Sequence, residues 1–169
     1  MINQKLKKIV FIDDDDINNF LVKDQLETYG FHGETVFFDA ALDALDYLRK
    51  LQSDLPIESP DIIFLDIKMP FMDGFDFLEA FKELHLNLYL PSKIFMVSSS
   101  TNEQDIQRSK DSGIVVDCIE KPLSIAQLER IAELHFSCKA LGLEAAAAHL
   151  QNRIHTALEK KPTGITRPA

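Results

Sequence analysis

The chain has 169 residues, 46% of them hydrophobic, and its 27 acidic and 18 basic residues give a formal net charge of -9. This length and hydrophobic content favour one domain with a tail. The negative charge opposes both the phosphate backbone of nucleic acids and anionic membrane surfaces, so we expect no nucleic acid and no membrane among the partners.

The N-terminal segment and the two cysteines indicate the cellular setting. The first apolar run, Ile9–Ile12, is too short for a secretory signal, and no stretch reaches a membrane-spanning length. Cys118 and Cys138 lie far apart, without the spacing of a disulfide framework or a zinc site. We therefore expect a cytoplasmic protein.

The first predicted unit is a strand, Ile9–Ile12, followed by a helix over residues 17–29. Gly30 suits the C-terminal cap of this helix, because glycine readily adopts the left-handed backbone that ends many helices. We expect a mostly apolar face of the helix to turn inward. This face consists of Phe20, Leu21, Asp24 and Leu26.

Two further units follow in the middle of the chain. Thr35–Phe38 is a predicted strand, and the next helix starts near Asp39, a residue that suits an N-cap. A polar loop then leads into Asp61–Asp66, an unbroken apolar run of the kind found in strands buried on both faces. A helix with apolar residues at helical spacing follows Gly74.

The C-terminal half predicts two more units. Ile94–Val97 is a strand that stops at a run of hydroxyl residues, and the helix after it ends at Gly113. The last strand is Ile114–Ile119, and the final core helix covers about residues 124–136. This alternation of strands and helices is typical of an α/β fold, in which helices cover both faces of a parallel sheet.

Polar residues follow four of the five predicted strands: Asp13–Asp16, Asp66, Ser98 and Lys121. The carboxyl ends of parallel strands meet at one edge of a sheet, so these side chains should converge there. Clustered carboxylates repel one another unless a cation lies among them, and oxygen ligands favour magnesium. With Mg2+ bound, Asp66 could attack phosphorus and become an aspartyl phosphate. Lys121 and Ser98 would then contact the phosphoryl oxygens.

Each of these residues also has an ordinary structural explanation. An aspartate before a helix is more often an N-cap than a ligand, which applies to Asp15 and Asp16. A serine at a strand end usually satisfies backbone groups, and a lone lysine is usually solvated. Acid, acid, hydroxyl and amine at four strand ends are nevertheless hard to explain by capping alone.

The segment Pro60–Gly74 closely resembles the phosphorylation segment of the receiver domains of two-component response regulators. The resemblance extends over about residues 7–136. It implies a flavodoxin-like three-layer sandwich, in which a five-stranded parallel sheet of order 2-1-3-4-5 carries five helices. It also implies a receiver domain at residues 1–136, followed by a C-terminal extension at residues 137–169.

The resemblance implies a role for each residue of the phosphorylation site. Asp66 is the phosphoacceptor and, with Asp14, ligates Mg2+ through its side chain. Asp13 holds a metal-bound water, and Lys68 ligates the ion through its backbone carbonyl.

A second set of residues matches the family's switch. Ser98 matches the switch hydroxyl, and Lys121 matches a lysine that is usually followed by a cis proline, here Pro122. Cys118 is a departure, because many members have Tyr or Phe at this position. The usual coupling between hydroxyl and aromatic ring is therefore left open, and Cys118 can also be read as a small buried residue at a strand end.

The resemblance implies a stand-alone response regulator that is not an enzyme beyond its own phosphorylation. Its partners would be a histidine kinase or histidine phosphotransfer protein and an unknown downstream protein. The tail is too short for a recognisable output domain. Its apolar spacing predicts an amphipathic helix carrying Leu143, Ala147, Leu150, Ile154 and Leu158, although a linker is an alternative.

Two other functions compete with this interpretation. A phosphatase of the haloacid-dehalogenase type would use Asp13 as its nucleophile, with Ser98 and Lys121 as supporting residues, but it leaves the segment after Asp66 unexplained. A receiver-like scaffold would bind partners without being phosphorylated. The complete set of acidic residues argues against the scaffold.

Overall fold

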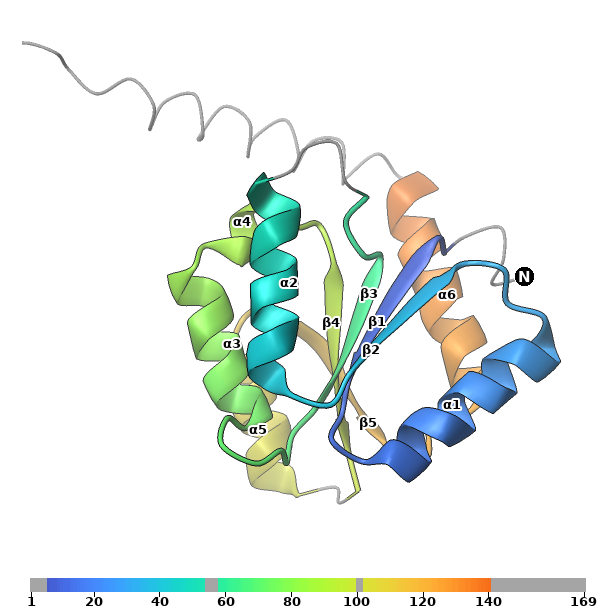
Figure 1. The fold of residues 1–169 in the computed structure, drawn as a ribbon, viewed down its shortest axis with the longest axis horizontal. Helices are drawn as coiled ribbons and strands as arrows, with labels where there is room; N and C mark the ends of the chain where they lie inside the picture. Colours follow the sequence, from blue (N-terminus) through green and yellow to red (C-terminus); the bar gives the residue numbers. More distant parts are fainter. Residues whose placement is uncertain (1–5, 54–57, 100–101, 141–169) are drawn as a thin grey trace, which may run out of the picture.

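The structure is a computed structural model that describes residues 6–53, 58–99 and 102–140 (Figure 1). The amphipathic helix predicted for residues 143–158 lies outside the described residues. Within the described part, no helix is both long and apolar enough to cross a membrane.

Five parallel strands form one sheet in the order β2-β1-β3-β4-β5, which confirms the expected topology. Every residue of the central strands β1 and β3 is buried, as expected for apolar runs covered on both faces. The strands are β1 Lys8–Ile12, β2 Glu34–Phe38, β3 Ile62–Asp66, β4 Lys93–Ser98 and β5 Val115–Glu120.

The described residues contain six helices, one more than expected: α1 Asp16–Tyr29, α2 Ala41–Ser53, α3 Gly74–Glu83, α4 Leu86–Tyr89, α5 Glu103–Asp111 and α6 Ile125–Ala140. The additional helix α4 forms after His85 adopts a left-handed backbone, with φ 57°, and Leu86 and Leu90 anchor it in the core. The helix α2 begins after Asp39, and α6 extends past residue 136. Element ends of this kind are the least certain part of a sequence prediction.

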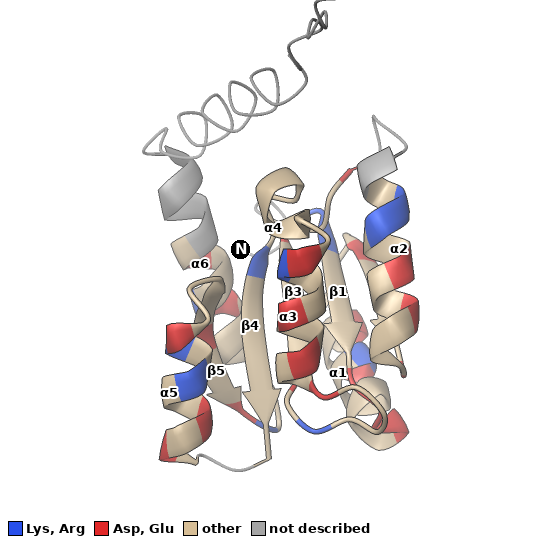
Figure 2. Cartoon of the chain, turned by 90° about the vertical axis from the view of Figure 1, so that its left-hand side faces the viewer, with Lys and Arg blue, Asp and Glu red and all other residues tan. Residues whose placement is uncertain are grey.

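The helices cover both faces of the sheet. Helices α2, α3, α4 and α5 lie on one face, and α1 and α6 lie on the other (Figures 1 and 2). Alternate side chains of each strand point to opposite faces, so Val10 and Ile63 join the core under α2 and α3, whereas Ile9 and Ile62 join the core under α1 and α6.

Four phenylalanines form a row across the sheet on the side of α1 and α6. Phe11 stacks on Phe37 and on Phe64, with ring centroids 4.9 and 5.1 Å apart, and Phe64 lies 5.8 Å from Phe95. These residues are direct partners in neighbouring strands. Because a slip of one residue would turn a ring to the opposite face, the row favours one register for four strands.

The ends of α1 follow the sequence prediction, but of the four residues predicted to turn inward only Leu26 is buried. Asp15 is the N-cap and accepts hydrogen bonds from the amides of Ile17 and Asn18, and Gly30 is the left-handed cap with φ 78°. The predicted inward residues Phe20 and Leu21 are 67% and 44% exposed.

The buried stripe of α1 runs through other residues. Val22 and Leu26 are its buried apolar members, and the half-buried Asn18 and Asn19 continue it one turn earlier. The stripe is therefore polar where it approaches the end of the sheet. For this reason the prediction from apolar spacing was right for Leu26 but wrong for Phe20 and Leu21.

Gly74 allows the first turn of α3 to pack directly on the end of β3. A β-carbon at this position would lie 2.4 Å from the carbonyl oxygen of Asp66 and 3.0 Å from Cε of Met96. The amide of Gly74 also donates a hydrogen bond to the carbonyl of Ile67, at 2.9 Å. The backbone around Asp66 is thus fixed by a contact that only glycine permits.

We expect Gly74→Ala to destabilise the protein by about 2 kcal/mol, because the methyl group must displace backbone atoms. The control is Gly30→Ala, where a β-carbon meets nothing within 4 Å and only the left-handed backbone opposes alanine, at a cost of about 1 kcal/mol. Urea denaturation followed by circular dichroism measures both. A smaller loss for Gly74→Ala than for Gly30→Ala would contradict the close packing.

Candidate functional site

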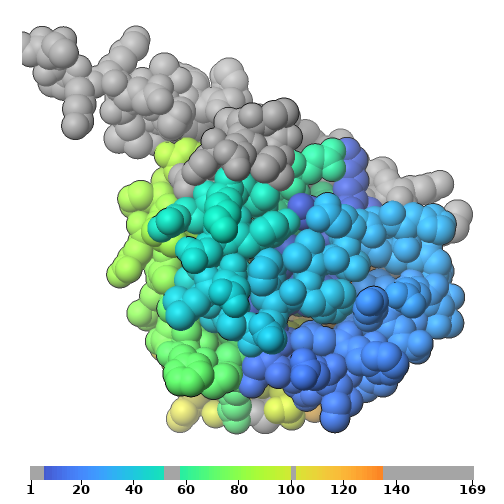
Figure 3. All heavy atoms as spheres, viewed as in Figure 1, coloured from blue at the N-terminus to red at the C-terminus, as the bar shows by residue number. Residues whose placement is uncertain are grey.

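The segments that follow β1, β3, β4 and β5 gather at one edge of the sheet. This is the lower edge in Figures 1 and 3, where segments coloured dark blue, green, yellow and orange lie together. The arrangement follows from the parallel direction of all five strands. It brings Asp13, Asp14, Asp66 and Lys121 into one cluster, with Ser98 at the adjoining end of β4.

Three carboxylates form the acidic part of the cluster. One oxygen from each of Asp13, Asp14 and Asp66 lies within 4.8 Å of the others. Asp13 and Asp66 are buried, with 3% and 5% exposure, whereas Asp14 is exposed. A donor set made only of oxygens, open to solvent on the side of Asp14, fits a hard divalent cation such as Mg2+.

Lys121 supplies the opposite charge. Its Nζ lies 2.7 Å from Oδ2 of Asp13 and 3.1 Å from Oδ1 of Asp66, so one ammonium group bridges two buried carboxylates. Burial by itself would lower the pKa of Lys121, but the hydrogen bonds and charges of Asp13 and Asp66 raise this pKa above its usual value. Lys121 is therefore a fixed cation at neutral pH.

The backbone around Lys121 holds it in place. The amide of Lys121 donates a hydrogen bond to the carbonyl of Ser98, at 2.8 Å, which ties the end of β5 to the end of β4. The Lys121–Pro122 peptide bond is cis, as the resemblance implied.

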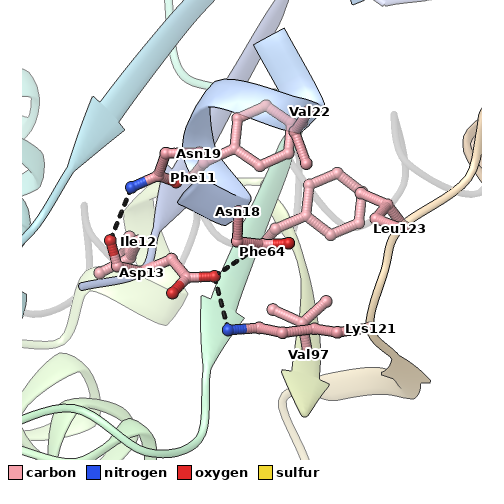
Figure 4. A pocket seen from close by; sticks show the side chains of 10 residues that line it. All are labelled: Phe11, Ile12, Asp13, Asn18, Asn19, Val22, Phe64, Val97, Lys121 and Leu123. Carbon is pink, nitrogen blue, oxygen red and sulfur yellow. Dashed lines mark hydrogen bonds and ion pairs between the residues drawn. The ribbon is translucent and has the colours of Figure 1, made fainter. Parts of the chain in front are cut away.

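Asp13 is fixed by the start of α1 (Figure 4). Nδ2 of Asn18 donates to Oδ2 of Asp13 at 2.6 Å, the amide of Asp15 donates to Oδ1 at 3.0 Å, and Nδ2 of Asn19 donates to the carbonyl of Asp13 at 2.7 Å. With Lys121 also in contact, both carboxylate oxygens of Asp13 have partners. The cavity beside them is small, with a volume of about 10 Å³.

The sequence prediction missed Asn18 and Asn19. The sequence did contain an indication of their role, because two adjacent amide side chains follow the aspartates by one helical turn. Without the phase of α1, however, nothing in the sequence showed that they turn inward.

The environment of Asp66 opposes the ionised form of its carboxyl group. Burial raises the pKa of Asp66 above its usual 3.8, while the charge of Lys121 lowers it and the charge of Asp13 raises it further. Ionised Asp66 therefore costs stability unless further positive charge is close by. A cation beside Asp66 and Asp14 would provide this charge.

The remaining predicted residues are Ser98, Lys68 and Cys118. Ser98 is buried at the end of β4, and Lys68 is exposed in the loop after β3. Cys118 is half-buried against the core under α2 and α3, and its thiol lies in hydrogen-bonding contact with Ser109 of α5. Burial raises the pKa of the Cys118 thiol, so the thiolate is disfavoured.

A groove of about 430 Å³ opens beside the acidic cluster. It lies between the loop after β3 and helix α5. We call it the side groove, and the residues that line it are Asp14, Ile67, Lys68, Met69, Pro70, Asp73, Phe75, Asp105 and Arg108.

Comparison with known proteins identifies relatives of this chain. A profile of the family described as "Response regulator receiver domain" matches residues 9–133. The chain is 32% identical over 128 residues to hybrid signal transduction histidine kinase L of Dictyostelium discoideum. This match covers 75% of this chain and 7% of that protein. It is 29% identical over 125 residues to the probable methanogenesis regulatory protein FilR2 of Methanothrix harundinacea, covering 74% of this chain and 78% of that protein.

Solved structures agree with these relatives. The crystal structure of a two-component response regulator from Cytophaga hutchinsonii matches with a TM-score of 0.71 and 26% identity, covering 79% of this chain and 98% of that one. The match thus includes nearly all of that regulator, whereas the chain spans only 7% and 11% of the length of two kinases that it matches.

We expect Asp66→Asn to be more stable than the wild type at pH 7 without divalent cations, by about 1 kcal/mol, because it removes a buried charge. The raised pKa means that the folded state binds a proton at Asp66 more readily than the unfolded state, so the wild type loses stability as pH rises through the folded pKa. The advantage of Asp66→Asn should therefore disappear below about pH 4.

Thermal unfolding at several pH values measures this difference. Asp46→Asn is the control, because Asp46 is exposed on α2. A mutant that is less stable than the wild type at pH 7, or an advantage that grows as pH falls, would contradict the assigned environment of Asp66.

Proposed function

This chain belongs to the response regulator receiver domain family, and on that basis we propose that Asp66 accepts a phosphoryl group in a two-component phosphorelay. Receiver domains act with histidine kinases and phosphotransfer proteins in such systems. The observation that carries the proposal is the position of the Asp66 carboxylate. It lies 3.1 Å from the ammonium of Lys121 and within 4.8 Å of oxygens from Asp13 and Asp14.

This geometry suits attack by Asp66 on phosphorus. One carboxylate oxygen of Asp66 forms the new bond to phosphorus, and the donor's leaving group departs on the opposite side. Lys121 needs only a small shift from its contact with Asp66 to reach a phosphoryl oxygen. Ser98 can donate its hydroxyl to another, because it directly follows Val97, the partner of Asp66 in β4.

We propose a Mg2+ site at the same carboxylates. Asp14 and Asp66 would ligate the ion by their side chains, Lys68 by its backbone carbonyl, and Asp13 would hold a metal-bound water. When bound, the ion neutralises phosphoryl oxygens and relieves the repulsion among the aspartates. Asn18 and Asn19 keep Asp13 in position for this task.

We further propose that the chain acts as a stand-alone regulator, with the receiver domain at residues 1–136 and an extension at residues 137–169. Its phosphodonor would be a histidine kinase or a histidine phosphotransfer protein, and a downstream protein would bind the phosphorylated form. Phosphorylation adds about 1.5 to 2 negative charges next to Ser98 and Lys121, so it would bias the positions of the segments that carry them.

The phosphatase alternative has less support. It requires Asp13 as nucleophile, but both oxygens of Asp13 are already engaged by Asn18, Asp15 and Lys121. Turnover separates the two functions. Steady release of phosphate from a generic ester, lost in Asp13→Asn and kept in Asp66→Asn, would favour the phosphatase.

The main prediction concerns labelling of Asp66. We expect one phosphoryl group per chain after incubation with phosphoramidate and Mg2+, and none in Asp66→Asn, because asparagine is not a nucleophile towards phosphorus. Intact mass spectrometry measures the gain directly. Asp46→Asn is the matched control and should be labelled as fully as the wild type, while labelling of Asp66→Asn would contradict the proposal.

A second prediction concerns the metal. We expect Mg2+ to raise the melting temperature of the wild type, and Asp14→Asn to weaken Mg2+ binding at least tenfold, since it removes a charged ligand open to solvent. Circular dichroism is the suitable probe because the chain has no tryptophan. Beryllofluoride with Mg2+ should stabilise the wild type further, and no effect of either reagent would favour the scaffold alternative.

A further inference from the structure

One oxygen of Asp13 receives two donors from different parts of the chain. Oδ2 of Asp13 lies 2.7 Å from Nζ of Lys121 and accepts a hydrogen bond from Nδ2 of Asn18 at 2.6 Å (Figure 4). Lys121 follows β5, whereas Asn18 lies in the first turn of α1. An ammonium group and an amide therefore share one buried acceptor.

The surroundings of this oxygen are mainly apolar. Six apolar residues line the small cavity beside it: Phe11, Ile12, Val22, Phe64, Val97 and Leu123. Asn19, which also lines the cavity, donates to the backbone carbonyl of Asp13 and not to its carboxylate. Because Asp13 is only 3% exposed, bulk water has little access to this oxygen, and its stability depends on Lys121 and Asn18.

Lys121 has a second partner that competes for its ammonium group. Its Nζ also lies 3.1 Å from Oδ1 of Asp66. A phosphoryl group on Asp66 would draw this ammonium towards a phosphoryl oxygen and away from Asp13. A buried carboxylate oxygen that loses its donor costs free energy, because nothing replaces the bond. The movement of Lys121 is therefore opposed unless another donor stays on Asp13.

Asn18 is the donor that can stay. The N-cap Asp15 accepts hydrogen bonds from the amides of Ile17 and Asn18, which fixes the first turn of α1. Further along the helix, Val22 and Leu26 anchor α1 in the core. These contacts do not involve Lys121 or Asp66, so the amide of Asn18 keeps its position whichever partner Lys121 takes.

We propose that Asn18 is a positioning residue that frees Lys121 from Asp13 for the phosphoryl group. The inference rests on the proposed phosphorylation of Asp66. With Asn18 present, Oδ2 of Asp13 keeps a hydrogen bond after Lys121 has moved. Without Asn18, the same movement leaves a buried anionic oxygen unsatisfied, so Lys121 stays with Asp13 and stabilises the phosphoryl group less.

This role goes beyond holding Asp13 in place. If Asn18 only fixed the side chain of Asp13, its loss would disturb the proposed metal-bound water and weaken the binding of Mg2+. A role in releasing Lys121 matters only when a phosphoryl group is present, because Lys121 otherwise remains bonded to Oδ2. Separate measurements of Mg2+ and of a phosphoryl mimic therefore distinguish the two roles.

The test compares the full wild-type chain with Asn18→Leu, which is similar in size but cannot donate a hydrogen bond. At saturating Mg2+ we expect Asn18→Leu to weaken beryllofluoride binding about tenfold, the cost of leaving one buried acceptor unsatisfied. Fluorine nuclear magnetic resonance measures the bound mimic directly.

The affinity for Mg2+ alone, measured by isothermal titration calorimetry, is the second readout. We expect it to change by less than about threefold in Asn18→Leu, because Lys121 and the amide of Asp15 still hold the carboxylate of Asp13. Asn18→Ala removes the amide without adding an apolar side chain. It should show a selective loss of the same kind, which keeps the test valid if leucine disturbs the packing.

Asn87→Leu is the matched control. Asn87 is another half-buried helical amide, but it lies on α4, at the opposite edge of the sheet from Asp13 (Figure 2). The same chemical change there should leave both affinities within about twofold of the wild type. Circular dichroism of each variant checks that the fold is retained.

The outcomes separate this inference from the proposed function. If both Asn18 variants weaken Mg2+ and beryllofluoride binding equally, Asn18 only holds Asp13, and the inference is overturned. Unchanged beryllofluoride affinity in both variants also overturns it, although Asp66 remains the acceptor. If the wild type neither binds beryllofluoride nor gains a phosphoryl group at Asp66, the proposed function fails and the inference fails with it.

Discussion

The site depends on two buried carboxylates that share one ammonium group. Asp13 and Asp66 end neighbouring strands, and burying both charges would be unfavourable without Lys121 between them. Lys121 reaches them because β5 lies beside β4 and its end is tied to Ser98. The packing of the sheet and the charge balance of the site are therefore coupled, since a shift of any of these strands would leave a buried charge without a partner.

The helix α1 shows how the site shapes the surrounding fold. Its buried stripe begins with Asn18 and Asn19, which hold Asp13, and continues with Val22 and Leu26 in the core. Polar residues on an inward face would normally weaken packing, but here each amide has a partner. The apolar residues Ile17 and Phe20 remain on the solvent side, where they are 72% and 67% exposed.

The contacts of Cys118 differ from those expected of an aromatic switch residue. The thiol contacts Ser109, whose hydroxyl donates to the carbonyl of Asp105 at 2.7 Å and lies 3.1 Å from Sδ of Met96. Ser109 is buried, so α5 is held on β4 and β5 by small side chains. With Arg108 stacked on Phe75, α5 is also linked to α3. These contacts connect β4, through Met96, to α5 and α3 without a large ring at position 118.

Local patterns in the sequence determined the five strands, most of the helices, the caps at Asp15 and Gly30, and the set of aspartates, serine and lysine at the strand ends. The site residues could be predicted in this way because the shared direction of the strands is enough to place them at one edge of the sheet. The order of the strands came from resemblance to a family. Tertiary structure decided the phase of α1, the roles of Asn18 and Asn19, the helix α4 and the groove beside Arg108. The phase of α1 and the groove beside Arg108 arise from contacts between segments far apart in the chain, such as that of Arg108 with Phe75. Asn18 and Asn19 contact the nearby Asp13, but only because the packing of α1 turns them inward.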